Sequence, residues 1–347
     1  MTLERQKRAS LVLQVTEDPV ASDALEQTLR PQSLLEYVGQ AKIKEHLGIH
    51  IKATRSRNEP LGHTLLHGPP GLGKTTLAYI IAHEMGAQIR VTSGPAIEKP
   101  GDLASLLTNL GEGDVLFIDE VHRLRPVIEE VLYGAMEDFL LDIMIGKGPT
   151  ARSVRLNIKP FTLVAATTKA GAVSAPLRDR FLHNFKLAFY EPMEMQQIVM
   201  RSASILNIPV DEDAAKLLAA ASRMTPRIGN RLIRAVRDFA HARGEQSITF
   251  ACAQETLRSL DIDSEGLDAT DRRLLHSIVD TFNGGPVGLS TLAALLAEEQ
   301  ETIEDVYEPY LLQQGYLQRT PKGRMATKKS YEKLGRELPP QAQMTMI

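Results

Sequence analysis

Short apolar runs alternate with helical patterns over the first two-thirds of the chain, after a polar leader at residues 1–24. Most of the runs are continuously apolar, as strands buried on both faces are. Strands that alternate with helices are typical of a parallel sheet covered by helices on both faces. The pattern predicts an α/β domain over residues 25–190, with strands at 64–67, 89–92, 114–118, 161–166 and 186–189.

Segment 141–158 interrupts this alternation between the third and fourth predicted strands. Its first part holds the apolar triplet Ile143-Met144-Ile145, and the run 154–158 follows after Gly146-Lys147-Gly148-Pro149. Two strand-like runs around a turn of glycine and proline predict a β-hairpin. The hairpin is therefore an insertion into the α/β domain.

Helical patterns with Ala, Leu and Ile faces take over at residue 191 and continue to residue 262. One helix begins clearly, because Thr225 is a suitable N-cap, Pro226 suits the first helical position, and Gly244 falls where a C-terminal cap is expected. This part of the chain is predicted to be a small all-α domain.

A third unit is expected over residues 263–347. Helical patterns at 270–282, 290–298 and 302–314 precede the segment 316–327, which contains the turn Pro321-Lys322-Gly323. Three helices closed by a hairpin suggest a winged helix, a relative of the helix-turn-helix.

The composition excludes several classes of protein. The apolar stretch at 11–15 is far too short for a signal peptide, and no stretch approaches the ~18 apolar residues of a membrane span. Cys252 is the only cysteine and has no partner for an intrachain disulfide. We therefore expect a soluble, cytoplasmic protein. Because the net charge is -3, any nucleic-acid contact must come from a local patch.

The string Gly68-Pro69-Pro70-Gly71-Leu72-Gly73-Lys74-Thr75 fits the P-loop pattern and lies between the first predicted strand and a helix that starts near Thr75. Glycines let backbone N–H groups surround phosphates, Lys74 reaches the terminal phosphates, and Thr75 offers a hydroxyl to Mg²⁺. The alternative is a turn that only connects strand and helix, but such a turn does not need Gly-Lys-Thr in that order. The sequence therefore predicts a site for ATP and Mg²⁺.

Two carboxylates, Asp119 and Glu120, follow the third predicted strand. Ligands of open α/β sheets bind at this edge, so we expect Asp119 to hold the metal and Glu120 to polarise the attacking water as the catalytic base. The alternative is a pair of acids that caps the next turn. We interpret His122 as a surface or core histidine without a chemical role.

These two motifs resemble AAA+ ATPases, and the strings 68–76 and 116–122 are similar to those of the RuvB family. Further stretches between residues 25 and 330 carry the same resemblance: Leu29-Arg30-Pro31, Tyr37-Val38-Gly39-Gln40, Thr92-Ser93-Gly94-Pro95, Ala135-Met136-Glu137-Asp138, Asp142-Ile143-Met144-Ile145-Gly146, Pro176-Leu177-Arg178-Asp179-Arg180-Phe181, Gly284-Gly285-Pro286-Val287-Gly288 and Gln318-Arg319-Thr320-Pro321.

The resemblance implies a AAA+ sheet, a helical lid and a winged-helix head that binds DNA. It implies an ATPase that moves on duplex arms and drives branch migration of Holliday junctions in homologous recombination and DNA repair. Family members act as hexameric rings with a RuvA-type junction-binding protein. The resemblance also brings in the SOS response to DNA damage and a RuvC-type resolvase.

The resemblance assigns nucleotide contacts beyond the motifs. Leu29 and Arg30, beside Tyr37 and Val38, are similar to the segment that packs on adenine and ribose, and Arg227 is similar to the arginine that couples the lid to nucleotide state. The implied contacts are Leu29, Arg30, Gly71, Gly73, Lys74, Thr75, Thr76, Glu137, Asp138, Phe139, Arg180, Tyr190 and Arg227, of which 137–139 lie at the subunit boundary.

Two catalytic assignments rest on the same resemblance, and each has an alternative. Thr168, or Thr167, is similar to the polar group that senses the γ-phosphate, although many relatives carry Asn there. Arg180, or else Arg178, is similar to the arginine finger inserted into the neighbouring subunit's site, where its charge stabilises the transition state. A surface ion-pair cluster around Asp179 is the alternative. A finger that acts on a neighbour implies assembly into a ring.

The winged helix has an unusual charge distribution. Acidic residues crowd the region of its third helix, where they would repel phosphate, whereas basic residues lie on the hairpin and after it. We infer that the hairpin touches the DNA backbone without reading sequence. Family matching supports Arg319 and Arg324 as contacts and leaves a contact near Gln300 in doubt. The alternative is a solvated basic tail.

The inserted hairpin is the candidate partner surface. Ile143, Met144 and Ile145 make its first arm unusually apolar, and in the RuvB resemblance this hairpin docks the RuvA-type partner. The alternative is packing on its own domain.

Two other functions compete with a DNA motor. A clamp-loader or initiator-like ATP switch would gate assembly on DNA without transport along it. A protein-remodelling ring would have an aromatic pore loop and no basic winged domain, so this sequence disfavours it.

Overall fold

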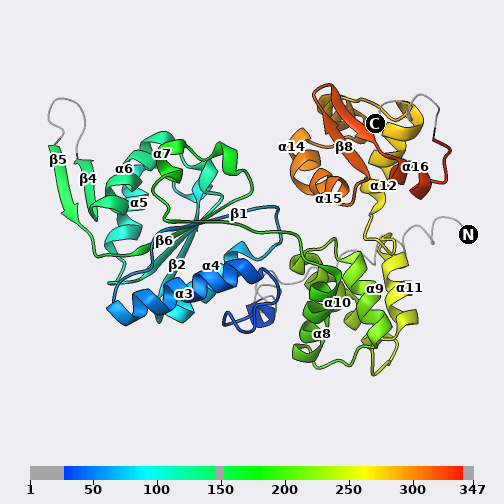
Figure 1. The fold of residues 1–347 in the computed structure, drawn as a ribbon, viewed down its shortest axis with the longest axis horizontal. Coiled ribbons are helices and arrows are strands. Elements are labelled where there is room, and N and C mark those ends of the chain that lie inside the picture. Colours follow the sequence, from blue (N-terminus) through cyan, green and yellow to red (C-terminus); the bar gives the residue numbers. More distant parts are fainter. Residues whose placement is uncertain (1–26, 146–151, 339–347) are drawn as a thin grey trace, which may run out of the picture.

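The computed structural model describes residues 27–145 and 152–338, so the leader predicted at residues 1–24 lies outside the described residues. Figure 1 shows three parts in chain order: an α/β domain, a group of helices that we call the lid (residues 191–262), and a unit that we call the head (residues 263–338). The lid and the head each have a cluster of buried apolar side chains, and the α/β domain has two, one of which also includes Met195 and Ala219 of the lid.

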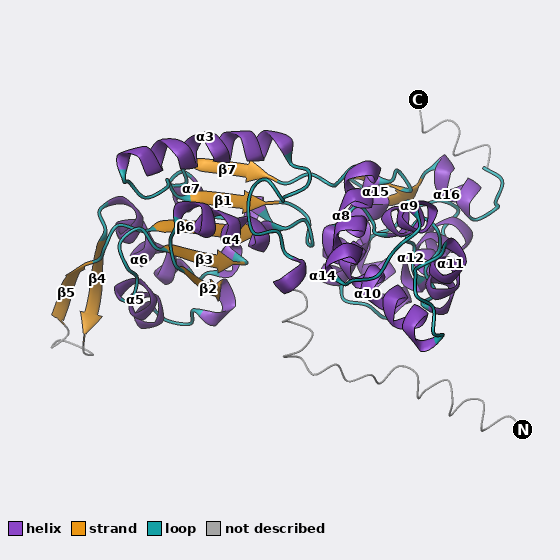
Figure 2. Ribbon diagram, turned by 90° about the horizontal axis from the view of Figure 1, so that it is seen from below, coloured by secondary structure: helices purple, strands orange, loops and turns teal. Residues whose placement is uncertain are grey.

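A five-stranded parallel sheet forms the centre of the α/β domain, in the order β2-β3-β6-β1-β7 (Figure 2). Successive side chains of a strand face opposite sides of the sheet, so Leu65 packs toward α5 and α6, whereas Leu66 packs toward α3 and α4. The predicted parallel sheet with helices on both faces is confirmed. Its elements are α3 (Ala41–Arg57), β1 (Thr64–His67), α4 (Lys74–Met85), β2 (Ile89–Ser93), α5 (Pro100–Thr108), β3 (Val115–Asp119), α6 (Pro126–Glu137), β6 (Thr162–Thr167), α7 (Ala175–Arg178) and β7 (His183–Lys186).

The predicted position of the last strand, 186–189, is wrong, because β7 covers His183–Lys186. This strand lies at the edge of the sheet, and its residues are buried and exposed alternately. An edge strand covered on one face lacks the continuous apolar run that marks a strand buried on both faces. The other predicted strands differ from β1, β2, β3 and β6 by at most one residue at either end.

The predicted hairpin is present as β4 (Leu140–Ile145) and β5 (Arg152–Asn157), which pair antiparallel with Ile143 opposite Val154. Figure 1 shows that it projects from the α/β domain on the side away from the head. The side chains of Ile143, Met144 and Ile145 lie outside the described residues, as does the tip at 146–151.

The lid consists of α8 (Pro192–Ile205), α9 (Glu212–Ala221), α10 (Pro226–Ala242) and α11 (Phe250–Ser259). Thr225 is the N-cap residue of α10, as predicted, but its hydroxyl donates to the Ser222 carbonyl and does not cap the helix. Gly244 adopts a left-handed conformation just after the helix ends, as expected of a glycine there.

The head contains helices and a hairpin, as predicted for a winged helix. Its first helix, α12 (Ala269–His276), continues as a π-helical turn (Ser277–Thr281), and α13 covers Leu289–Leu296. The third helical segment begins earlier than predicted and is broken into α14 (Gln300–Thr302), a π-helical turn (Ile303–Tyr307) and α15 (Glu308–Gln313). The hairpin is β8 (Leu317–Thr320) and β9 (Gly323–Ala326), and a short helix that we did not predict follows it, α16 (Lys328–Lys333).

Candidate functional site

The loop before α4 is shaped by two glycines in left-handed conformations. Gly71 has a φ of 79° and Gly73 a φ of 95°, which side chains other than that of glycine rarely tolerate. A Cβ atom at Gly73 would lie 2.8 Å from the hydroxyl of Tyr37. Gly73 is also the N-cap of α4, so the first N–H groups of this helix face a loop of bare backbone. Such N–H groups lack partners within the helix and bind anions well.

Lys74 is the first residue of α4, and only 8% of it is exposed. Its Nζ donates hydrogen bonds to the carbonyls of Gly68 and Pro69, both at 2.8 Å. Burial lowers the pKa of Lys74 to about 8, and the negative charge of Asp119 acts in the opposite direction. The fold thus keeps a cation with an incomplete counter-charge at the end of the loop.

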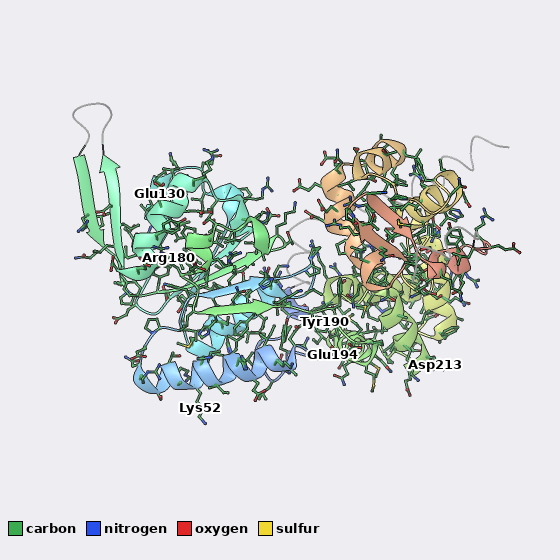
Figure 3. All side chains as sticks on the ribbon, turned by 45° about the horizontal axis from the view of Figure 1, so that its top comes forward. Lys52, Glu130, Arg180, Tyr190, Glu194 and Asp213 are labelled. Carbon is green, nitrogen blue, oxygen red and sulfur yellow. The ribbon has the colours of Figure 1, made fainter. Side chains whose placement is uncertain are left out.

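Two buried tyrosines hold the loop in place. The Tyr37 hydroxyl donates to the Leu72 carbonyl at 3.2 Å, and the Tyr190 hydroxyl donates to the Tyr37 oxygen at 3.0 Å. Burial raises the pKa of Tyr190 to about 12, so both hydroxyls keep their protons and can donate. Figure 3 places Tyr190 where the α/β domain meets the lid. Tyr190, which lies at the junction that we call the hinge, is therefore bonded, through Tyr37, to the P-loop.

The paired acids lie at the carboxyl end of β3. Asp119 is its last residue, and Glu120 follows in a left-handed conformation with φ 48°. The Glu120 N–H donates to Asp119 Oδ1 at 2.8 Å, and Arg123 donates to Glu120 Oε2 at 3.1 Å. Backbone strain at a residue other than glycine is typical of functional sites.

The two threonines after β6 have different surroundings. Thr167 is buried, and its hydroxyl is 2.9 Å from His122 Nδ1 and accepts from the Lys169 N–H. Thr168 instead lines the pocket that also contains Lys74 and Asp119. Of the two candidates for a γ-phosphate sensor, Thr168 is the one that faces this pocket.

A cavity of about 480 Å³ brings the loop, the acids and the lid together. Most of the predicted nucleotide contacts line it: Leu29, Arg30, Tyr37, Val38, Gly71, Gly73, Lys74, Thr75, Thr76, Asp119, Glu120, Thr168, Tyr190 and Arg227. Eight other lining residues were not among the predicted contacts: Pro31, Glu36, Pro70, Ile198, Arg201, Ser202, Pro226 and Asn230.

Arg201 and Arg227 come to the cavity from the lid. Arg201 donates to the Leu29 carbonyl at 2.8 Å and pairs with Glu36 at 2.9 Å. The Arg227 N–H donates to the Gly71 carbonyl at 3.4 Å. Arg201 has no motif around it in the sequence. Only its position on the face of α8 that meets the α/β domain distinguishes it, and this position is visible only in the fold.

Several predicted residues lie outside this cavity: Glu137, Asp138, Phe139, Arg178 and Arg180. Figure 3 shows Arg180 on the side of the α/β domain that carries α6 and the hairpin. Its guanidinium is 4.4 Å from the centre of the Tyr133 ring and 3.2 Å from the Glu137 carboxylate. Within one chain, then, neither arginine reaches the pocket, and Arg180 is held together with Glu137.

The residues present fit a nucleotide with its magnesium ion. The glycine cradle, the N-terminus of α4 and the Lys74 ammonium suit phosphates. Within residues 27–145 and 152–338, His, Cys, Asp and Glu nowhere gather in groups of three or more that would form a metal cage. Mg²⁺ usually needs only one or two protein oxygens besides substrate phosphates and water, and Thr75 and Asp119 line the same cavity.

The two arginines of the head's hairpin share one carboxylate. Glu308 is 1% exposed and accepts hydrogen bonds from both Arg319 and Arg324. The Arg319 side chain is 49% exposed, whereas that of Arg324 is 13% exposed. Arg319, which also pairs with Glu304, is therefore the arginine that can reach a phosphate at the surface, while both arginines compensate the buried charge of Glu308.

The acidic face of the head's third helical segment also has a partner in the α/β domain. Lys169, next to Thr168, pairs with Glu301 at 2.6 Å and with Asp305 at 2.9 Å. Part of the acidic crowding seen in the sequence is thus compensated within the chain. Gln300 begins α14, next to this contact.

Among the described residues, none of the helices combines the length and the apolar character needed to cross a bilayer.

Three family models match successive parts of the chain. Residues 29–187 match the Holliday junction DNA helicase RuvB P-loop domain, residues 190–263 match the RuvB AAA lid domain, and residues 264–335 match the RuvB C-terminal winged helix domain.

Whole proteins with the same architecture are also similar. The Holliday junction branch migration complex subunit RuvB of Chloroflexus aggregans is 58% identical over 315 residues, which cover 91% of this chain and 90% of that protein. The structure of the Thermotoga maritima RuvB Holliday junction branch migration motor superposes with a TM-score of 0.82 at 47% identity, covering 90% of this chain and 100% of that one. A mutant of the same Thermotoga maritima protein gives a TM-score of 0.83 at 48% identity, covering 90% and 99%.

Proposed function

The chain belongs to the RuvB family of AAA+ ATPases, and from this premise we propose that it hydrolyses ATP to drive branch migration of Holliday junctions. The observation that carries the proposal is the single cavity that gathers the P-loop, the acids after β3 and an arginine of the lid. A nucleotide in such a cavity touches both domains, so its state can set the angle between them. The high identity to a branch migration subunit favours this motor over a clamp-loader or initiator-like switch.

We assign the chemical steps to residues of the cavity. The N–H groups at the start of α4 and the Lys74 ammonium bind the phosphates, while Thr75 and Asp119 hold Mg²⁺, which neutralises charge on the phosphates. Glu120 orients and polarises the attacking water. To do so, Glu120 has to leave its hydrogen bond with Arg123. Thr168 contacts the γ-phosphate, and Leu29 and Arg30 pack on the base and ribose.

We propose that the site is completed by a neighbouring subunit. Arg180 lies outside its own chain's cavity and beside Glu137, as a residue that serves the next subunit would. Its charge then stabilises the transition state across the interface, with Glu137, Asp138 and Phe139 at the same boundary. In a closed ring, by family analogy a hexamer, every site receives an arginine from its neighbour.

We propose that the head and the hairpin contact the partners. Arg319 is the exposed arginine for the DNA backbone, with Arg324 behind it. Ile143, Met144 and Ile145 of β4 are the contacts for a RuvA-type protein that positions the ring on a duplex arm. A RuvC-type resolvase acts on the same junction.

We propose the biological setting by analogy with the family. We place the protein in homologous recombination and DNA repair, in the cytoplasm, within the SOS response to DNA damage. We propose four functional units: a leader (1–24), an ATPase domain (25–190), a lid (191–262) and a DNA-binding unit (263–347) that contains the head.

Migration of a synthetic four-way junction tests the proposal. We expect ATP-dependent strand exchange that a RuvA-type partner stimulates and that Lys74→Ala abolishes. ATP turnover without any strand exchange, with or without the partner, would instead favour the switch.

A further inference from the structure

The turn between α9 and α10 connects the nucleotide cavity to the hinge. Arg223 and Met224 both have positive φ values, 52° and 56°, which residues other than glycine rarely adopt unless their surroundings hold them there. The Met224 carbonyl accepts from the Tyr190 N–H at 3.1 Å, and three residues later the Arg227 N–H donates to the Gly71 carbonyl. A change at the P-loop or hinge therefore reaches this turn directly.

The same turn is also anchored in the head. Arg223 NH1 donates to Asp271 Oδ2 at 2.9 Å and NH2 donates to Oδ1 at 3.3 Å. Asp271 is 0% exposed, the Arg223 side chain is 9% exposed, and its guanidinium lies 4.8 Å from the centre of the Tyr310 ring. Met224 packs against the buried apolar cluster of the head. The contact between lid and head is thus buried and has two adjacent anchors.

Asp271 is itself fixed within the head. It lies in the first turn of α12, and its Oδ2 accepts from the Asp268 N–H at 3.0 Å. The neighbouring residues Leu274 and Leu275 belong to the same core as Leu317 and Ala326 of the hairpin. A displacement of Arg223 therefore also displaces the core of the head, on which the hairpin β8–β9 is packed.

The head's contact with the α/β domain is weaker by comparison. Among the described residues, the ion pairs that join them are those of Lys169, whose partners Glu301 and Asp305 are 72% and 30% exposed. Water and salt screen pairs with exposed partners, which contribute little. The Arg223–Asp271 pair is bidentate and buried, and separating lid from head would also expose Met224, which packs on the apolar cluster of the head. When the lid rotates away from the α/β domain, we therefore expect the Lys169 ion pairs to break and the Arg223–Asp271 pair to remain.

We propose that Arg223 is a positioning residue that holds the head to the lid. A nucleotide-driven rotation of the lid then moves the hairpin β8–β9, the proposed DNA contact, together with the lid. This rests on the proposed function for the part that concerns DNA. Loss of the pair should leave ATP hydrolysis in place and uncouple it from DNA movement.

Distances between spin labels test the mechanical part. Three exposed positions carry the labels: Lys52 on α3, Asp213 on α9 and Lys328 on the head. Lys52 and Asp213 are labelled in Figure 3. Two double-cysteine variants, at 52 and 213 and at 213 and 328, are made in a Cys252→Ala background. We expect the 52–213 distance to change between a non-hydrolysable ATP analogue and ADP, while the 213–328 distance stays constant. In Arg223→Gln the 213–328 distribution should broaden. A 213–328 distance that follows the nucleotide in the unaltered protein, or that stays sharp in the variant, would overturn the proposal.

Activity measurements test the coupling. In Arg223→Gln we expect ATP turnover without DNA to stay within about twofold of the unaltered protein and junction migration per ATP to fall about tenfold or more. Asp271→Asn keeps the shape of the acid and should act in the same direction if Arg223→Gln does not fold.

Arg243→Gln is the matched control, because its partner Glu255 lies in the same domain and both are exposed. This variant should change neither ATP turnover nor migration per ATP. Equal migration per ATP in all variants would refute the role of Arg223. If the unaltered protein moves no junction at all, the proposed function fails, whereas the distance test still decides the mechanical part.

Discussion

Burial of the Lys74 ammonium group affects its protonation as well as its position. Its pKa is lowered from 10.5 to about 8, so the folded protein is penalised for carrying this charge below pH 8. The penalty disappears as the pH rises from 8 through 10.5, because the group is then neutral first in the folded and finally in the unfolded chain. The phosphates of a bound nucleotide favour the charged form and should raise the pKa again.

ATP binding is therefore predicted to take up a proton above pH 8 and none well below it. Affinity should be constant at about pH 7 and fall as the pH rises through 8, because the free protein then has to gain the proton on binding. Calorimetric titrations at about pH 9, in buffers with different ionisation enthalpies, measure the uptake, and titrations at about pH 7 are the internal control. Heats independent of the buffer at the higher pH would contradict the prediction.

Arg180 should be required for turnover but not for binding. The residue lies outside its own chain's cavity, so Arg180→Ala should leave ATP affinity nearly unchanged and reduce hydrolysis about 10³-fold or more. Because the finger acts on a neighbour, mixing this variant with inactive Lys74→Ala should restore part of the activity at mixed interfaces. Arg178→Ala is the comparison that separates the two candidates. A purified monomer hydrolysing at the full rate would rule out a finger in trans.

Motif residues of the site could be predicted because they are contiguous in sequence. The strings around Lys74 and Asp119 carry their chemistry in a fixed spacing that the residue types alone reveal. Arg201 and Asn230 could not be predicted, since each stands alone on a lid helix and reaches the cavity only through domain packing.

At the level of elements, the two ends of α4 allow a controlled test of the loop. Gly73→Ala combines a left-handed conformation with a clash against Tyr37, whereas Gly86→Ala has the same kind of conformation, φ 68°, and open space. Both should lose about 1–2 kcal/mol of stability from backbone strain. Gly73→Ala alone should also lose ATP binding, measured by titration with a fluorescent nucleotide. Normal affinity in Gly73→Ala would show that the close packing of the loop on Tyr37 is not needed.

Substitutions of the two arginines in the head's hairpin should affect DNA binding and stability to different degrees. Arg324→Gln removes the more buried of the two arginines that pair with Glu308; because Arg319 still pairs with this carboxylate, the cost should be about 2 kcal/mol, seen as a lower midpoint of thermal unfolding. Arg319→Gln should keep more of the stability, weaken binding to all duplex sequences, and make the slope of affinity against salt shallower by about 1. Lys52→Gln on α3, exposed and outside the head, is the control for the loss of one positive charge alone. An unchanged salt slope in Arg319→Gln would argue against its contact with phosphate.

The central strands could be predicted, whereas the edge strand β7 and the short helix α16 could not, although the other edge strand, β2, was predicted to within one residue. Central strands such as β6 are buried throughout, so their sequences carry a clear signal. The edge strand β7 alternates and was misplaced, and the short helix α16 follows the hairpin in a stretch that reads only as basic. Local sequence does not record which face of such an element a neighbour covers.

For the whole molecule, the order of its parts could be predicted, but their contacts could not. The patterns indicated an α/β part, a helical part and a winged helix in this order. The Arg223–Asp271 pair joins residues 48 positions apart, and Lys169 meets an acidic segment that, in sequence, only argued against DNA contact. Contacts between domains depend on complementary surfaces that no single segment specifies.

The central claim is that ATP hydrolysis at the cavity between loop, acids and lid drives the movement of DNA. Glu120→Gln tests it most directly when ATP hydrolysis and migration of a labelled four-way junction are recorded in the same reaction. We predict that the variant binds ATP with about the affinity of the unaltered protein and that hydrolysis and migration are lost together, by about 10²-fold or more. Migration that continues at the normal rate while hydrolysis is lost would contradict the account.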